Sequence, residues 1–424
     1  MIGSAQVLAL LVCGAAPSGA VAQVDGVEIT AAQVAERAAE LRGAGAKGTA
    51  DDALESVVLD VLLAAEARRM GLDAAPAVKA RLARERAKLA ATVLVEQEAA
   101  AAAKPAEEEL RRQYHLTADS AQVRVVVFPT EDAARVAAAL AAKAGNLDAA
   151  GTAPVQGFEP ASLNGAKLRA QLPPALAEPV FTAPVGVPAG PVALELGWAL
   201  FTVVQRSVGD EAGYARKREG IAAFLLSQQI GALREHLRAQ LRKRAKVTID
   251  EPFLGTVGPA PTPAELEHVV ATVNGEPIRY AEIEPAARQI VRSSGHDPGA
   301  GLRRDLLDKV IGERLLEQAA AERKLLDHPA VAARFPAAER RVLATVWVEN
   351  LAAGIPQPSE EDIKAFWKAK VAPSGQSLEA THDQIAAFLR DTKRNDELLA
   401  KGRELRARAQ LTVDRVALAQ AIPN

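Results

Sequence analysis

A short motif occurs twice in the chain, 249 positions apart, and this repetition constrains the fold more than any other feature. Residues 22–34 read AQVDGVEITAAQV, and residues 271–283 read ATVNGEPIRYAEI. An apolar strand, a DG or NG pair and a second apolar strand are typical of a β-hairpin with a two-residue turn. After the first loop the offset becomes 253 and stays constant over 54–114 of the first copy. This constant offset indicates an internal duplication.

Both copies are predicted to be mainly helical. Thr30 and Gln33 have the spacing of a capping box at the start of the first helix. Beyond the hairpins, leucine and alanine recur at helical spacing through both copies. The leucines that we assign to the cores of the two copies are Leu62, Leu63, Leu315 and Leu316.

The first copy contains a segment that the second copy lacks. The IAAFL motifs at 221–225 and 385–389 lie 164 positions apart, and so do VTID at 247–250 and LTVD at 411–414. The offset thus falls from 253 to 164, so about 89 residues are inserted in the first copy. The insert combines the strand pattern QVRVVVF, an amphipathic helix and two closing strands, which predicts a small α+β module.

The predicted fold class is therefore mainly α, with two duplicated helical frames and a small α+β module that interrupts the first. We expect VTID to pair with the VDGVEI hairpin and LTVD with the VNGEPI hairpin, so that each frame closes on itself. The predicted segments are an export signal at 1–22, the first helical frame at 23–117, the inserted module at 118–213, the returning helix and strand of the first frame at 214–254, a linker at 255–266 and the second frame at 267–424.

Composition narrows the compartment and the partners. The net charge of −2 provides no general attraction to nucleic acid or to an anionic membrane. The first 22 residues carry no charge and end in the small-x-small pattern of Ala20 and Ala22, which predicts an export signal. The one cysteine, Cys13, lies inside this signal, and the alternative of a lipoprotein is disfavoured by Val12 before it. No other stretch reaches the roughly 18 uncharged apolar residues of a membrane span.

The chain resembles the SurA, PrsA and PpiD group of exported folding factors. The resemblance is carried by VNGEPI, by LLDKVIGERLLEQAAAERKL with DHPAV after it, and by QLPPALAEPVF followed by GPVALELGWALFTVV. It implies SurA-like helical chaperone frames, the first of which is interrupted by a parvulin-like (FKBP-like α+β) peptidyl-prolyl isomerase domain.

The resemblance also places a parvulin site in the insert, and there the chain departs from the family. Val125 and Ala199 stand where the two parvulin histidines are expected, and the central glycine-rich stretch has shrunk to QGFEPASLNG. Leu172, Leu176 and Phe181 match positions that line the proline pocket of parvulins, although ordinary core packing is the alternative for all three.

These departures favour binding over catalysis. Rotation about an X-Pro bond has a barrier of ~18–20 kcal/mol, so an isomerase must bind the twisted amide more tightly than the planar one. Without the imidazoles the polar network for this task is lost. We predict an exported folding factor that binds unfolded polypeptides, including outer-membrane proteins, without cofactor or metal and with an impaired isomerase module. The alternatives are an active peptidyl-prolyl isomerase and a non-catalytic subunit of an envelope assembly.

Other motifs are weaker. GAGAKG at 43–48 has the spacing of a dinucleotide loop but follows a helix, which disfavours nucleotide binding. SSGHD at 293–297 places Ser, His and Asp side by side, whereas catalytic triads join separated segments. The six histidines are not clustered, which disfavours a metal site. LREHLRAQLRKRAK at 233–246 is strongly basic, and we interpret it as a solvated helix face.

Overall fold

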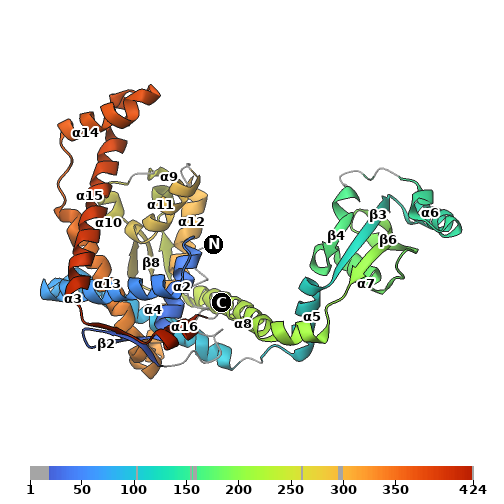
Figure 1. Cartoon of the computed structure of the whole chain (residues 1–424), viewed down its shortest axis with the longest axis horizontal. Coiled ribbons are helices and arrows are strands. Elements are labelled where there is room, and N and C mark those ends of the chain that lie inside the picture. Colours follow the sequence, from blue (N-terminus) through green and yellow to red (C-terminus); the bar gives the residue numbers. More distant parts are fainter. Residues whose placement is uncertain are drawn as a thin grey trace. The chain divides into compact units, whose positions relative to one another are not determined.

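The chain divides into two compact units in the computed structural model (Figure 1). One unit comprises residues 1–102 and 229–424, and the other comprises residues 103–228. The structure describes residues 19–101, 104–152, 155, 160–258, 261–294 and 299–422. Helices predominate and the sheets are small, which confirms the predicted fold class.

The first unit is built from helices and two small sheets. Its elements before the second unit are β1 (Ala20–Val24), β2 (Val27–Thr30), α2 (Ala31–Gly43), α3 (Ala50–Arg69), η1 (Leu72–Ala74) and α4 (Pro76–Ala100). Its elements after the second unit are β7 (Val247–Ile249), α9 (Glu251–Thr256), α10 (Pro263–Glu267), β8 (Val269–Val273), β9 (Glu276–Arg279), η5 (Tyr280–Glu282), α11 (Glu284–Ser294), α12 (Gly299–Glu322), η6 (Leu325–Asp327), α13 (Pro329–Gly354), α14 (Glu360–Phe366), the π-helical turn η7 (Trp367–Val371), η8 (Ala372–Ser374), α15 (Leu378–Arg408), β10 (Leu411–Val413) and α16 (Arg415–Ala421).

The second unit contains the predicted α+β module. Its elements are α5 (Glu107–Ala118), β3 (Ser120–Phe128), α6 (Glu131–Ala144), η2 (Leu147–Ala150), η3 (Pro160–Leu163), β4 (Gly165–Leu168), η4 (Arg169–Gln171), α7 (Pro174–Thr182), β5 (Pro188–Leu194), β6 (Gly197–Ser207) and the first part of α8 (Glu211–Arg244), which continues into the first unit. This compact unit, residues 103–228, is therefore larger than the predicted insert at 118–213, because it also includes α5 and the start of α8.

The two predicted hairpins form. Asp25 and Gly26 turn the first hairpin with φ of 48° and 81°, and Asn274 and Gly275 turn the second with φ of 53° and 90°. Two consecutive positive φ values match the twist of the strands, and Asn, Asp and Gly adopt them at the lowest cost. The capping box forms as well, since Thr30 Oγ1 accepts from the backbone N–H of Gln33 at 3.3 Å.

The third strand of each sheet comes from the other copy, so the predicted pairing of each frame with its own strand is wrong. The sheet orders are β10-β1-β2 and β7-β8-β9. In the first sheet Gln23 pairs with Thr412, and in the second Thr272 pairs with Thr248. The physical reason is that both hairpins offer an equivalent edge, and the chain between β7 and β8 is short, so that β7 reaches the edge of β8 at a small loop-closure cost.

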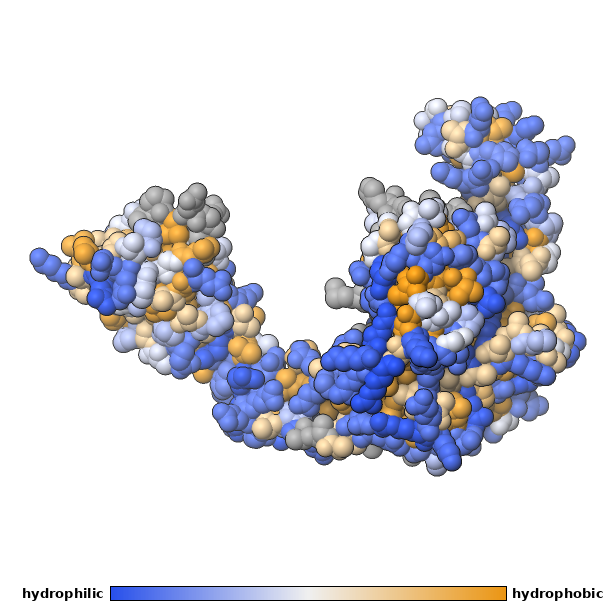
Figure 2. Space-filling view, turned by 180° about the vertical axis from the view of Figure 1, so that it is seen from behind, coloured by the Kyte–Doolittle hydropathy of each residue, from blue (hydrophilic) through white to orange (hydrophobic). Residues whose placement is uncertain are grey.

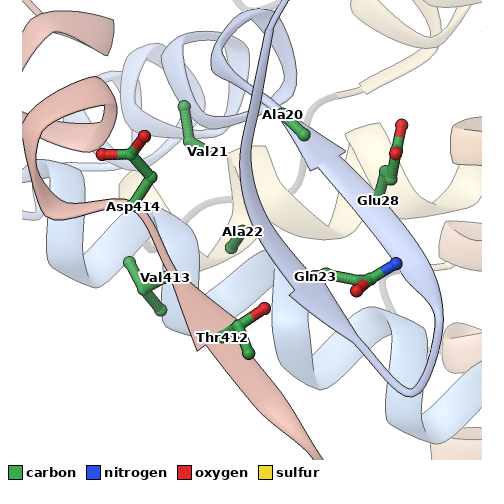
Figure 3. Close-up of a pocket in the computed structure, with 8 residues that line it drawn as sticks. All are labelled: Ala20, Val21, Ala22, Gln23, Glu28, Thr412, Val413 and Asp414. Atoms are coloured by element: carbon green, nitrogen blue, oxygen red, sulfur yellow. The ribbon is translucent and has the colours of Figure 1, made fainter.

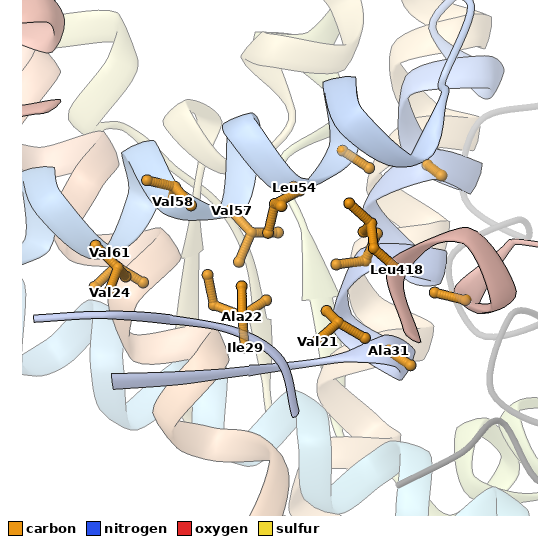
Figure 4. Close-up of a cluster of buried hydrophobic side chains, with 14 of the residues drawn as sticks. Val21, Ala22, Val24, Ile29, Ala31, Leu54, Val57, Val58, Val61 and Leu418 are labelled. Carbon is orange, nitrogen blue, oxygen red and sulfur yellow. The ribbon is translucent and has the colours of Figure 1, made fainter. Parts of the chain in front are cut away.

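Each sheet covers a separate hydrophobic core. Core A lies between β1, β2, α2 and α3, and Figure 4 shows Leu418 of α16 in this cluster with Leu54 and Val21. Core B lies between β8, η5 and α12, and Leu254 of α9 is fully buried in it. We call β10 with α16 (411–422) arm A, and β7 with α9 (247–257) arm B. Each arm completes the core of the copy to which it does not belong in sequence.

The leucines assigned to the cores are buried, as predicted; the exposed fractions of Leu62, Leu63, Leu315 and Leu316 are 5%, 3%, 3% and 0%. The basic segment of α8 is not simply a solvated face, and that interpretation is wrong for two of its arginines. Arg234 and Arg238 are each only 17% exposed, and both pair with Glu313 of α12. The helical spacing of four residues places them on the same face, which packs against α12.

The predicted boundary of the export signal conflicts with the fold. Residues 1–18 lie outside the described residues, but Ala20–Val24 forms β1. Val21 is 1% exposed, and its carbonyl oxygen accepts from Asp414 N at 2.9 Å. A chain that started at residue 23 would lose most of this strand.

Candidate functional site

The candidate site lies on one face of the sheet in the second unit. This sheet has the order β4-β3-β6-β5 with antiparallel neighbours. Side chains alternate between the two faces of a strand, and β3 accordingly sends Val123, Val125 and Val127 to one face. Phe128 packs on the other face, which α6 covers. Helix α7 and residues before β4 cover the first face, which we call the site face.

The site face brings all five predicted site positions into one cluster. Val125 of β3 and Ala199 of β6 lie on it, in strands that pair directly. Leu172, at the end of η4, and Leu176 and Phe181 of α7 pack against them. The five positions therefore share one face of the sheet.

This cluster is closed. The exposed fractions of Val125, Ala199, Leu172, Leu176 and Phe181 are 2%, 0%, 5%, 0% and 7%. Side chains that line an open groove retain accessible surface, whereas these five have the burial of a packed core. The burial thus favours the alternative of core packing that the sequence leaves open.

One polar side chain reaches the backbone of β3 at Val125, where the resemblance places a histidine. Asn164 Oδ1 accepts from the backbone N–H of Val125 at 2.6 Å. Asn164 belongs to the shortened QGFEPASLNG segment, so this segment ties itself to the centre of β3. The bond satisfies a backbone donor, and it supplies no titratable group to the site face.

A buried carboxylate holds the base of the module together. Asp119 is fully buried, between α5 and β3. Its Oδ1 accepts from Gly209 N at 2.9 Å and contacts His115 Nδ1 at 2.9 Å. Its Oδ2 accepts from Arg169 Nε at 3.0 Å. Since these partners come from α5, η4 and the segment after β6, Asp119 links the entry and the exit of the module. A single acidic residue between a helix and a strand has no distinguishing pattern, so sequence reasoning misses it.

Two arginines hold α7 over the site face. The guanidinium of Arg169 lies 4.3 Å from the centre of the Phe181 ring, a cation–π geometry. Arg206 Nη1 donates to the carbonyl oxygens of Phe181 at 2.6 Å and Ala183 at 3.0 Å. A cation at the last carbonyls of a helix is favourable, because these groups carry partial negative charge. The two contacts fix Phe181 from its side chain and from its backbone.

Polar contacts join helices α5 and α8, the two connections of the module. Glu107 accepts from Tyr214 Oη at 2.6 Å and from Arg218 Nη2 at 2.7 Å, and the hydrogen bond from Arg218 lowers the pKa of Glu107. Arg111 makes a bidentate pair with Glu211 at 2.7 and 2.8 Å. The helices that lead into and out of the module are therefore held together by ion pairs and a hydrogen bond.

The first unit offers a different feature, a shallow hollow of about 380 Å³ beside arm A. Figure 3 shows that Ala22 and Gln23 of β1 line it together with Thr412 and Val413 of β10. The hollow lies along the seam between these strands. Its polar side chains are those of Gln23, Glu28, Thr412 and Asp414, and the Asp414 carboxylate caps α16.

Within the part of the chain that the structure describes, no helix has both the length and the apolar character needed to cross a membrane. No group of three His, Cys, Asp or Glu side chains in the described ranges could hold a metal ion.

Comparison with known proteins identifies the module. Residues 105–216 match the family model of the PPIC-type PPIase domain. A solved structure described as one of "two structurally-related SurA-like chaperones", the virulence factor PEB4 and the periplasmic protein Cj1289 of Campylobacter jejuni, is 16% identical, with a TM-score of 0.20, and covers 55% of this chain and 100% of its own. Comparison with curated proteins gives no match. The chain therefore carries a PPIC-type, that is parvulin-type, peptidyl-prolyl isomerase domain within a mainly helical fold, as its sequence predicts.

Proposed function

We propose that the protein is an exported folding factor that binds unfolded polypeptides and whose parvulin-type domain has lost most of its isomerase activity. The single observation that carries the proposal is the closed apolar cluster of the site face. Val125 and Ala199 replace the expected imidazoles, and both are buried. The cell envelope is the proposed compartment, because the residues before β1 are uncharged and apolar, as in an export signal.

The loss of activity follows from the chemistry of the cluster. Stabilising a twisted amide requires polar groups that are already oriented when the substrate binds. The five side chains of the cluster are all apolar, and their packing leaves almost no accessible surface for a peptide. A substrate would have to displace α7, which Arg169 and Arg206 hold in place.

Client binding is supported by apolar side chains on the surface. Figure 2 shows apolar patches among mainly hydrophilic residues on both units. Phe224 of α8 and Phe388 of α15 are 46% and 54% exposed, although phenylalanine is normally buried. They occupy the same position of the two IAAFL motifs. Several weak apolar contacts on one chain raise the overall affinity for a long flexible partner.

Two assays test the proposal. A protease-coupled assay with a proline peptide measures isomerisation, and we expect a rate near the uncatalysed one. Dilution of an unfolded outer-membrane barrel into buffer measures suppression of aggregation, and we expect suppression at a few-fold molar excess. A rate comparable to that of an intact parvulin, lost on Phe181→Ala, would show an active isomerase instead. No isomerase activity and no suppression together would favour a structural subunit of an envelope assembly.

A further inference from the structure

Arms A and B make the same backbone contacts with their sheets. Asp414 N donates to Val21 O at 2.9 Å in arm A, and Asp250 N donates to Val270 O at 3.0 Å in arm B. Each of these aspartates then caps the short helix of its arm. The registers of β10 on β1 and of β7 on β8 are equivalent residue by residue. The backbone alone therefore does not distinguish the two arms.

Side chains anchor arm B strongly. The Phe253 ring stacks on His268, with ring centroids 3.9 Å apart and planes inclined by 12°. His268 Nε2 contacts Asp250 Oδ2 at 2.8 Å, and Tyr280 meets the Phe253 ring edge-on with a centroid distance of 5.6 Å. Leu254 is fully buried in core B. Ring contacts, the contact between His268 and Asp250 and a buried leucine thus act together on one short helix.

Arm A lacks these ring contacts, although Leu418, the equivalent of Leu254, is buried in core A. By register, Ala417, Gly19 and Ala31 occupy the positions of the Phe253, His268 and Tyr280 rings. Arg415 pairs with Asp51, but their side chains are 71% and 72% exposed, and water screens such a pair. The buried contacts of α16 come mainly from Leu418 and Ala421. Arm A therefore has fewer side-chain anchors than arm B.

The surface under arm A is suited to an extended peptide. Beneath it lie the edge of β1, with backbone groups that pair with a third strand, and the apolar side chains of core A. A shallow hollow of about 380 Å³, whose lining includes Gln23, Glu28 and Thr412, lies beside β1 and β10, which stay paired along it (Figure 3). A sheet edge beside apolar side chains is the arrangement that binds peptides by strand addition.

We propose that arm A is a detachable strap, and that an extended apolar segment of an unfolded polypeptide replaces it on β1 and core A. The chemistry of the occupant is that of the strap itself. Leu411 and Val413 alternate with Thr412 along the strand, and Leu418 fills the core a few residues later. This inference rests on the proposed function, since it assigns the place where a client binds.

The strap also sets the affinity. Because it is part of the same chain, it competes with a client at high effective concentration. The apparent affinity for a client is reduced by the fraction of molecules in which the strap is attached. Weak, reversible binding of this kind suits a factor that has to release its clients.

A disulfide lock on the full chain tests the proposal. Gln23→Cys with Thr412→Cys joins directly opposed residues of β1 and β10, and Cys13→Ser removes the one natural cysteine. The matched control is Thr272→Cys with Thr248→Cys, the equivalent pair of arm B. The probes are a labelled peptide with the sequence of residues 410–422 and an unfolded outer-membrane barrel, each tested with the oxidised and the reduced protein.

We expect oxidation of the arm A pair to weaken binding of both probes at least tenfold, and reduction to restore it. Oxidation of the arm B pair is expected to change binding by less than twofold. Equal binding of the probes by the oxidised and reduced forms of the arm A variant would refute the proposal that arm A detaches.

Hydrogen exchange of the protein without any client gives an independent test. Amides of β1 are expected to exchange at least tenfold faster than the equivalent amides of β8, and the arm A lock is expected to remove the difference. Equal protection of β1 and β8 in the unlocked chain would overturn the strap even if clients bind. Fast exchange in β1 with binding of the peptide, but without binding of the barrel, would leave the strap in place and refute the proposed function.

Discussion

Asp119 makes a sharp prediction about the stability of the parvulin-type domain. In Asp119→Ala the backbone N–H of Gly209 and the Nε of Arg169 lose their acceptor, whereas Arg169 keeps its contact with Glu178 and is 21% exposed. The loss of the acceptor of a buried N–H costs about 1–3 kcal/mol. We therefore expect the free energy of unfolding of this domain to fall by roughly that amount.

Asp148→Ala is the matched control in the same domain. Asp148 pairs with Arg124, but its side chain is 69% exposed, so its removal is expected to cost less than about 1 kcal/mol. Asp119→Asn is expected to resemble Asp119→Ala, because its amide N–H₂ would face either the Arg169 or the Gly209 donor. Asp119 differs from Asp148 in its burial and in its contacts with Gly209 and His115, so the difference between the two variants measures the joint effect of burial and these contacts.

Native-state hydrogen exchange of β3 and β6 is the appropriate assay. The chain has two compact units, so a single global unfolding transition is not expected, whereas exchange reports the local opening free energy of each strand. Peptides from α3 and α13 in the first unit serve as internal references and are expected to keep their protection. A loss in β3 no larger than that caused by Asp148→Ala would refute the reasoning.

Three further predictions concern the site, acid stability and core B. Val125→His with Ala199→His is expected to give no isomerase activity in the proline-peptide assay and to lower the melting temperature, because polar rings would enter a full core. A hydrogen bond from Arg69 lowers the pKa of Glu66 from 4.5 to about 2, so the stability that Glu66 contributes is present above pH 4.5 and is lost as the pH falls towards 2. In denaturant titrations the free energy of unfolding of Glu66→Gln is expected to fall less steeply with decreasing pH than that of the unchanged protein. An equally steep fall would contradict the assignment. Leu254→Ala is expected to cost about 2–5 kcal/mol in denaturant unfolding of the first unit, and a cost below about 1 kcal/mol would show that α9 does not complete core B.

The positions of the candidate site could be predicted from the sequence, but whether the site is open or packed could not. The spacing of Leu172, Leu176 and Phe181 relative to Val125 and Ala199 follows the parvulin pattern, and the structure gathers all five on one face. Whether that face is an open groove or a packed core depends on how closely α7 approaches the sheet. The approach is controlled by contacts such as those of Arg169 and Arg206, between residues distant in sequence, and no local pattern encodes them.

The internal duplication remains a prediction, which the matching registers of the two sheets support. The hairpins, the helix caps and the alternation of β3 follow from local sequence, because each depends on residues within a few positions of one another. Asp25 with Gly26, for example, specifies its turn through its own backbone preferences.

Long-range contacts select the strand that completes each sheet. VTID and LTVD have the same pattern, and the two hairpins present equivalent edges, so local preference is equal for both pairings. The choice depends on chain connection and on distant side chains, such as Phe253 against His268 in core B and Leu418 in core A. Interactions of that range are formed by folding and have no periodicity in the sequence, which is why the exchange of arms becomes visible only in three dimensions.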